Sequence, residues 1–163
     1  MVLNPVEFGF QTDEQTLALA DLSARLNHEP EEGRFQSIEA LLKHPTDGVQ
    51  SAGLKLLVSS VHSEDLLARA VLIGFDVADA SWMKTWIRFI VPRLGFPRTF
   101  DLIRDNMGKK PRGVSAAIYW LGWLIAPEEA EQIQEYLRLK DEASHLGVLR
   151  DVQPIPVYDD ATR

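Results

Sequence analysis

Apolar residues recur every three or four positions along most of the chain, and this spacing predicts α-helices. The clearest example is Arg34 to Val61, where two amphipathic stretches flank a polar turn. Pro45 ends the first stretch because the residue before a proline disfavours helical backbone angles. Thr46 or Asp47 can cap the second. Each predicted helix is too short to bury its apolar face within this hairpin, so further helices must pack against it.

The same spacing predicts seven to eight helices in all. They cover roughly residues 13–26, 34–44, 47–61, 64–75, 82–94, 98–107, 114–126 and 128–139, with the last extending to 145 as an alternative. Residues 1–11 are expected to form an extended lead-in, and the Pro- and Gly-containing segment 27–33 a polar linker. We expect one domain over residues 1–146 and an extended tail over 147–163.

The second helix of the hairpin recurs along the chain. Val49, Ala52 and Leu56 align with Trp82, Thr85 and Phe89 at a shift of 33 residues, and the next shift, to Val114, Ala117 and Leu121, is 32. The preceding helices keep similar spacing, and residues 16–23 form a weaker copy upstream. A period of this size built from helix pairs is typical of stacked helical repeats.

Residues 40–56 and 103–121 resemble HEAT-like repeats, in which a turn with Pro or Asp precedes a helix opening with Val, two residues and Ala. The resemblance covers about residues 12–139. It implies an all-α fold, a short right-handed stack of antiparallel helical hairpins, and a role in binding other macromolecules. The basic residue usual after the Val is absent, and the middle copy opens with Trp82. A compact irregular α–α bundle is therefore the alternative to a regular superhelix.

The composition narrows the possible classes of protein. The chain has 163 residues, 45% of them hydrophobic, and no cysteine, which excludes a disulfide scaffold and thiolate zinc sites. The N-terminus lacks the basic and apolar segments of a secretory signal. The longest apolar run, 114–126, is shorter than the ~20 residues of a membrane span. We expect a cytoplasmic protein with no membrane association, and a monomer.

The charge is unevenly distributed. The net charge is −7, but residues 81–113 carry eight basic and only two acidic side chains. An acidic body disfavours general nucleic-acid binding, whereas the basic stretch leaves room for a local anion site. The candidates for that site are Arg104, Lys109, Lys110 and Arg112. The alternative is a solvated face paired with the acidic last helix.

No catalytic signature is present. The four histidines are predicted in turns or at helix ends, and no metal-binding, nucleophile or phosphate-binding motif occurs. We expect no catalytic activity, no cofactor and no metal site. An enzyme that acts on a small molecule is a further alternative, for which the sequence nominates no residue. Candidate partner-binding residues on the second helices are Trp82, Lys84, Trp86, Arg88, Trp120 and Trp123. Core packing is the alternative for each tryptophan.

The leading hypothesis is a non-catalytic protein–protein interaction module. Small size and acidic charge suggest an inhibitor or immunity-type protein that blocks a basic protein through Glu29, Glu31 and Glu32. The alternative is a nucleic-acid-binding protein similar to the HEAT-like DNA glycosylases, using the basic stretch 84–112. The partner is therefore expected to be another protein, and nucleic acid is the less favoured choice.

Overall fold

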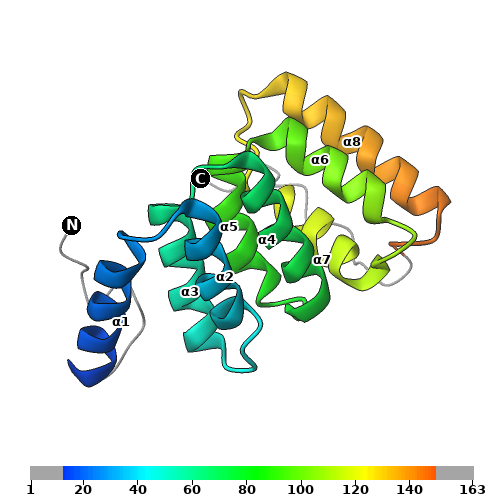
Figure 1. Cartoon of the computed structure of the whole chain (residues 1–163). Coiled ribbons are helices and arrows are strands. Elements are labelled where there is room, and N and C mark those ends of the chain that lie inside the picture. Colours follow the sequence, from blue (N-terminus) through cyan, green and yellow to red (C-terminus); the bar gives the residue numbers. More distant parts are fainter. Residues whose placement is uncertain (1–12, 150–163) are drawn as a thin grey trace, which may run out of the picture.

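The computed structural model describes residues 13–149, which fold into eight α-helices without strands in that range (Figure 1). The helices are α1 (Asp13–Leu26), α2 (Glu31–Leu42), α3 (Asp47–Ser60), α4 (Glu64–Val77), α5 (Met83–Leu94), α6 (Phe96–Asn106), α7 (Pro111–Leu121) and α8 (Ala130–His145). The all-α prediction is confirmed. The predicted lead-in over 1–11 lies outside the described residues, as does 150–163 of the predicted tail.

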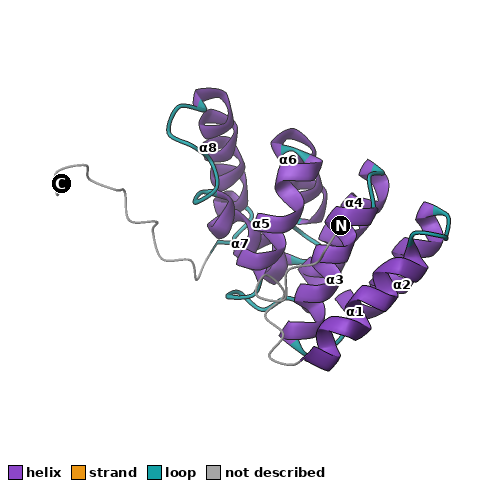
Figure 2. Ribbon diagram, turned by 90° about the vertical axis from the view of Figure 1, so that its left-hand side faces the viewer, coloured by secondary structure: helices purple, strands orange, loops and turns teal. Residues whose placement is uncertain are grey.

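The helices stack in two layers. Helices α2, α4, α6 and α8 lie next to one another in one layer, and α1, α3, α5 and α7 in the other (Figure 2). This alternation agrees with the spacing of about 32 residues in the sequence, since equivalent helices fall in the same layer. The first layer spreads more widely than α3, α5 and α7 (Figure 2). The second layer is therefore the narrower side of the stack.

Several helix ends differ from the prediction, most clearly those of α2 and α7. Helix α2 begins at Glu31, inside the segment predicted to be a linker, because acidic residues in a first turn interact favourably with the helix dipole. Helix α7 begins at Pro111, since proline suits a first helical position, and it ends at Leu121. Beyond it the chain turns, with the Trp123 N–H donating to the Trp120 carbonyl at 3.1 Å. The predicted end at residue 126 was wrong.

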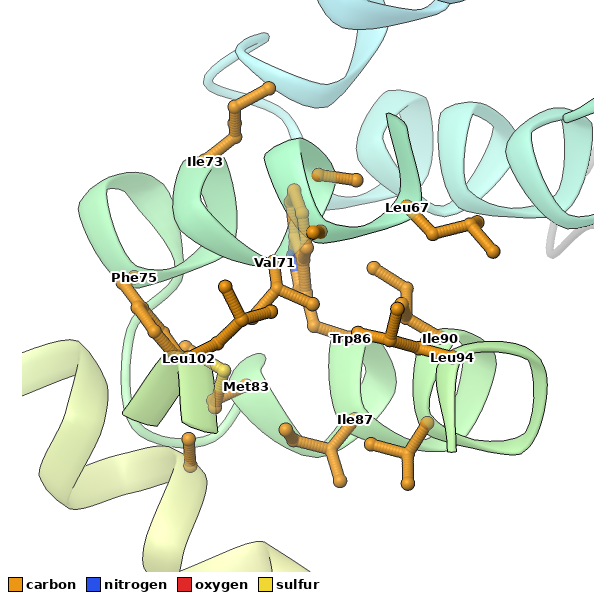
Figure 3. Close-up of a cluster of buried hydrophobic side chains, with 14 of the residues drawn as sticks. Leu67, Val71, Ile73, Phe75, Met83, Trp86, Ile87, Ile90, Leu94 and Leu102 are labelled. Atoms are coloured by element: carbon orange, nitrogen blue, oxygen red, sulfur yellow. The ribbon is translucent and has the colours of Figure 1, made fainter. Parts of the chain in front are cut away.

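The core lies between the two layers, and its centre is the contact between α4 and α5 (Figure 3). Trp86 is its largest fully buried side chain, with 2% of its surface exposed. The indole packs directly against Gly74 of α4, where an added Cβ would lie 2.5 Å from Trp86 Cε3. Only a residue without a side chain leaves room for this ring.

Helices α4 and α7 also approach closely through a glycine. A Cβ built on Gly113 would lie 2.3 Å from the carbonyl oxygen of Phe75. The first turn of α7 therefore rests on the backbone of α4. This contact sets the position of α7 in the second layer.

Polar contacts join neighbouring hairpins. The Glu31 carboxylate of α2 accepts hydrogen bonds from the backbone N–H groups of His62 and Ser63, which precede α4. These N–H groups lower the pKa of Glu31, with that of His62 having the larger effect. Arg34 reaches the same connection and donates to the Ser60 carbonyl at 2.8 Å. Helix α2 is thus joined to the connection between α3 and α4.

Candidate partner-binding surface

A hollow opens on the second layer between α5 and α7. It has a volume of about 470 Å³ and is lined by Lys84, Ile87, Arg88, Tyr119, Trp120, Trp123 and Leu124. We call it the α5–α7 hollow. Its volume falls within the ~300–1,000 Å³ over which proteins commonly bind organic groups.

Helical periodicity places the α5 side chains. Lys84 and Arg88 are four residues apart, so they lie on one face, and both are exposed. Trp86 falls on the opposite, buried face of the same helix. Ile87 is 2% exposed and closes the floor of the hollow from α5. The hollow thus has an apolar floor and a basic edge.

The aromatic wall comes from the end of α7. The Trp120 indole N–H donates to the carbonyl of Ala80, and the Trp120 ring meets Tyr119 edge-on with centroids 4.9 Å apart. Lys84 Nζ lies 5.0 Å from the centroid of the Trp120 ring, a distance at which a cation is attracted to the ring face. Trp120 is therefore held in place from α5 and from the α4–α5 connection.

Trp123 projects from the turn that follows α7. It retains 43% of its surface exposed, which makes it one of the exposed large apolar side chains of the described residues. Because α7 ends at Leu121, Trp123 lies in the turn and not within the helix. An exposed indole beside a hollow is a typical anchor for a partner.

A second, smaller hollow adjoins the first. It has a volume of about 330 Å³ and is lined by Lys84, Thr85, Arg88 and Phe89. Lys84 and Arg88 line both hollows, so they form a basic ridge between them. Neither has a carboxylate partner among residues 20–149, whereas ion pairs occupy Arg25, Lys43, Arg69, Arg98, Arg104, Lys110 and Arg138.

The structure brings together four of the six residues predicted to bind a partner: Lys84, Arg88, Trp120 and Trp123. The prediction was wrong for Trp86, because its indole is enclosed in the core against α4. Trp82 is half-buried against the core and does not line the hollow. The buried position of Trp86 matches the core-packing alternative.

Two of the four residues predicted to bind an anion take part in ion pairs between helices. Arg104 pairs with Glu135 and Glu142 of α8, and its guanidinium lowers the pKa of Glu135. Lys110 pairs with Asp76 and donates to the Leu72 carbonyl. These two cations therefore join neighbouring helices. For Arg104 this is the alternative given above, in which the basic stretch pairs with the acidic last helix.

Lys109 and Arg112, the other two members of the predicted anion site, are exposed. Neither has a carboxylate partner in the described part of the chain. They lie at the opposite end of α7 from Trp123. They therefore do not belong to the hollow.

Sequence reasoning missed Tyr119, Ile87 and Leu124 as lining residues. Tyr119 precedes Trp120 directly, and Leu124 follows it by four residues, so helical spacing was the available signal. That signal also fits core packing, and it does not show which face a neighbouring helix covers.

The described residues offer no cluster of three or more His, Cys, Asp or Glu side chains that could hold a metal ion. None of the helices in this range has the length and apolar character needed to cross a membrane. What the hollow presents is aromatic surface, aliphatic surface and two cations. This arrangement is suited to noncovalent recognition.

Comparisons with protein-family models, curated proteins and solved structures find no match to this chain.

Proposed function

We propose that this protein is a non-catalytic protein–protein interaction module of the HEAT-like kind, which binds another protein at the α5–α7 hollow. The observation that carries the proposal is an exposed indole, Trp123, beside an apolar hollow with a basic edge. Tryptophan, tyrosine and arginine are the residue types that contribute most often to the binding energy of protein interfaces. All three types occur here within one surface.

The position of the hollow in the stack also supports this role. It lies on the narrower, second layer, where helices contributed by successive hairpins come side by side. Stacked helical repeats bind partners on extended surfaces of this kind. The surrounding core and the Gly113 contact hold α5 and α7 in position, so the surface is formed before a partner arrives.

The narrower hypothesis of an inhibitor or immunity-type protein stays a prediction. Two of the three acidic residues on which it depends have partners within the chain: Glu31 accepts from the backbone before α4, and Glu32 pairs with Arg69 at 2.7 Å. A cytoplasmic location and a monomeric state also stay predictions. The basic edge of the hollow favours an acidic contact at this surface instead.

The nucleic-acid alternative also stays a prediction, and the aromatic and basic composition of the hollow is the observation in its favour. Arg104 and Lys110 of the basic stretch pair with carboxylates, which reduces the number of cations available to phosphates. Protein binding is therefore preferred.

Affinity capture tests the proposal. Tagged full-length protein would be incubated with lysate of its own source after nuclease treatment, and the retained proteins would be identified by mass spectrometry. Trp123→Ala combined with Arg88→Ala should lose a stoichiometric partner that the unmodified protein retains. The matched control, Lys109→Ala with Arg112→Ala, removes exposed cations away from the hollow and should keep the partner.

A partner retained equally by both variants would contradict binding at the hollow. Recovery of nucleic acid alone, lost on nuclease treatment, would support the alternative.

A further inference from the structure

We infer that the α5–α7 hollow recognises an acidic peptide segment in which an aromatic or large aliphatic side chain stands next to one or two carboxylates. This inference rests on the proposed function and names the chemistry of the partner. It follows from the combination of an apolar hollow and a basic ridge whose two cations meet no carboxylate among residues 20–149.

The lining of the hollow indicates which kind of peptide side chain would enter it as the anchor. Ile87 and Leu124 supply aliphatic surface, while Trp120 and Trp123 supply aromatic surface. A side chain entering this space would cover the exposed part of Trp123 and be removed from water itself. An aromatic or large aliphatic group suits such a lining better than a polar one, which would lose its hydrogen bonds to water.

The basic ridge indicates the charge of the bound peptide. Lys84 and Arg88 line both hollows, and neither meets a carboxylate within residues 20–149. The acidic residues nearest to them in the sequence are engaged elsewhere: Asp76 pairs with Lys110, and Asp79 accepts from the Trp82 N–H at 2.7 Å. Lys84 also lies over the Trp120 ring, 5.0 Å from its centroid. In a chain with 24 acidic and 17 basic residues, two neighbouring cations without a carboxylate partner among residues 20–149 are available for carboxylates from outside.

The spacing of the two cations fits carboxylates on one segment. Four residues of helix separate them by about 6 Å along the axis of α5. Carboxylates one turn apart on a helix, or two residues apart on an extended segment, have a similar separation of about 6–7 Å. A peptide can therefore place an anchor in the hollow and carboxylates on the ridge together.

A single-stranded nucleic acid is the competing class of ligand. It requires a basic path along which several phosphates lie, and here the ridge offers two cations on a protein of net charge −7. A short acidic peptide needs only these two. The observations favour the peptide.

The test selects peptides from a random displayed library on the full-length protein. The most enriched peptide is then synthesised with a fluorescent label, and its affinity is measured by anisotropy. Enriched sequences should combine Asp or Glu with an adjacent aromatic or large aliphatic residue. Lys84→Glu with Arg88→Glu should weaken binding by about tenfold or more, since two attractive charge pairs become repulsive.

The matched control is Lys109→Glu with Arg112→Glu, which changes the net charge by the same amount at a distant surface. This variant should bind the peptide with unchanged affinity at moderate salt. Circular dichroism would show that each variant keeps its helix content. Equal weakening by both double variants would overturn the inference, because only overall charge would then matter.

Three further outcomes would overturn it. They are a library that enriches no peptide, enriched peptides that lack acidic residues, and displacement of the peptide by a labelled oligothymidine at the same site. Peptides that need Trp123 but neither cation would refute the acidic chemistry while leaving the proposed binding function standing. If, in addition, the lysate yielded no protein whose capture depends on the hollow, both the acidic chemistry and the proposed binding function would be refuted.

A segment of the chain itself is the remaining alternative occupant. Tyr158 is followed by Asp159 and Asp160, a sequence of the same chemistry. Full-length protein carrying Tyr158→Ala, Asp159→Asn and Asp160→Asn should bind the labelled peptide as the unmodified protein does. A gain of about tenfold or more would assign the hollow to this segment and overturn the external partner.

Discussion

Replacing Gly113 by alanine should destabilise the protein by forcing α7 away from α4. The new Cβ would lie 2.3 Å from the carbonyl oxygen and 2.5 Å from the Cα of Phe75. Ordinary contact begins at 3.4 Å, so the oxygen and the methyl group must separate by about 1.1 Å. Both sides of the contact are anchored by backbone, so a change of rotamer cannot relieve it.

The magnitude follows from two opposing effects. Overpacking a close contact costs about 1–3 kcal/mol, and a clash with backbone belongs at the upper end or above it. Alanine gains at most about 1 kcal/mol over glycine from its helix propensity, and less in a first turn. The net loss is therefore about 2 kcal/mol, which corresponds to a fall in Tm of about 4–8 °C for a domain of this size.

Urea unfolding followed by circular dichroism would measure the change in free energy. Gly48→Ala is the matched control, because Gly48 also lies in a first turn and nothing is within 4 Å of its added Cβ. The control should be neutral or slightly stabilising. A Gly113→Ala variant as stable as the unmodified protein would refute the close approach of α4 and α7.

Three further predictions test other parts of the structure. Trp86→Ala should cost about 3–5 kcal/mol in urea unfolding because it empties the core, whereas Trp123→Ala should leave stability nearly unchanged; equal losses would contradict the placement of the two indoles. The lowered pKa of Glu31 means that its carboxylate stabilises the fold at pH values above 4.5, and that this contribution is lost as the pH falls through the lower folded pKa. Glu31→Gln should therefore be less stable than the unmodified protein at neutral pH, with the difference shrinking in acid; a pH-independent difference would argue against the carboxylate contact. Burial raises the pKa of Tyr136 to about 12, so a spectrophotometric titration of Tyr136→Phe should lack a late phenol ionisation that the unmodified protein shows.

The helices and their alternation could be predicted from the sequence because they depend on local rules. Apolar spacing marks the buried face of each helix, and residues such as Pro45 and Asp47 mark the ends. The spacing of about 32 residues indicated which helices are equivalent, and these helices share a layer. The errors at α2 and α7 concern helix ends, where a few residues can continue a helix or form a turn.

The candidate site was only partly predictable, because the same local signal has two outcomes. Trp86 and Trp120 both lie at helical spacing, yet Trp86 is in the core because Gly74 of another helix leaves room for its ring. Arg104 and Arg88 both belong to the basic stretch, yet Arg104 meets Glu135, which is 31 residues away. No rule about neighbouring residues identifies such a partner.

The sequence by itself therefore determined the all-helical fold, the pairing of helices into hairpins and the basic character of α5. The tertiary structure decided which tryptophans are covered, which cations are paired and where a hollow remains. The physical reason is range: helix formation depends on residues three or four apart, whereas burial and ion pairing depend on helices brought together by the stack.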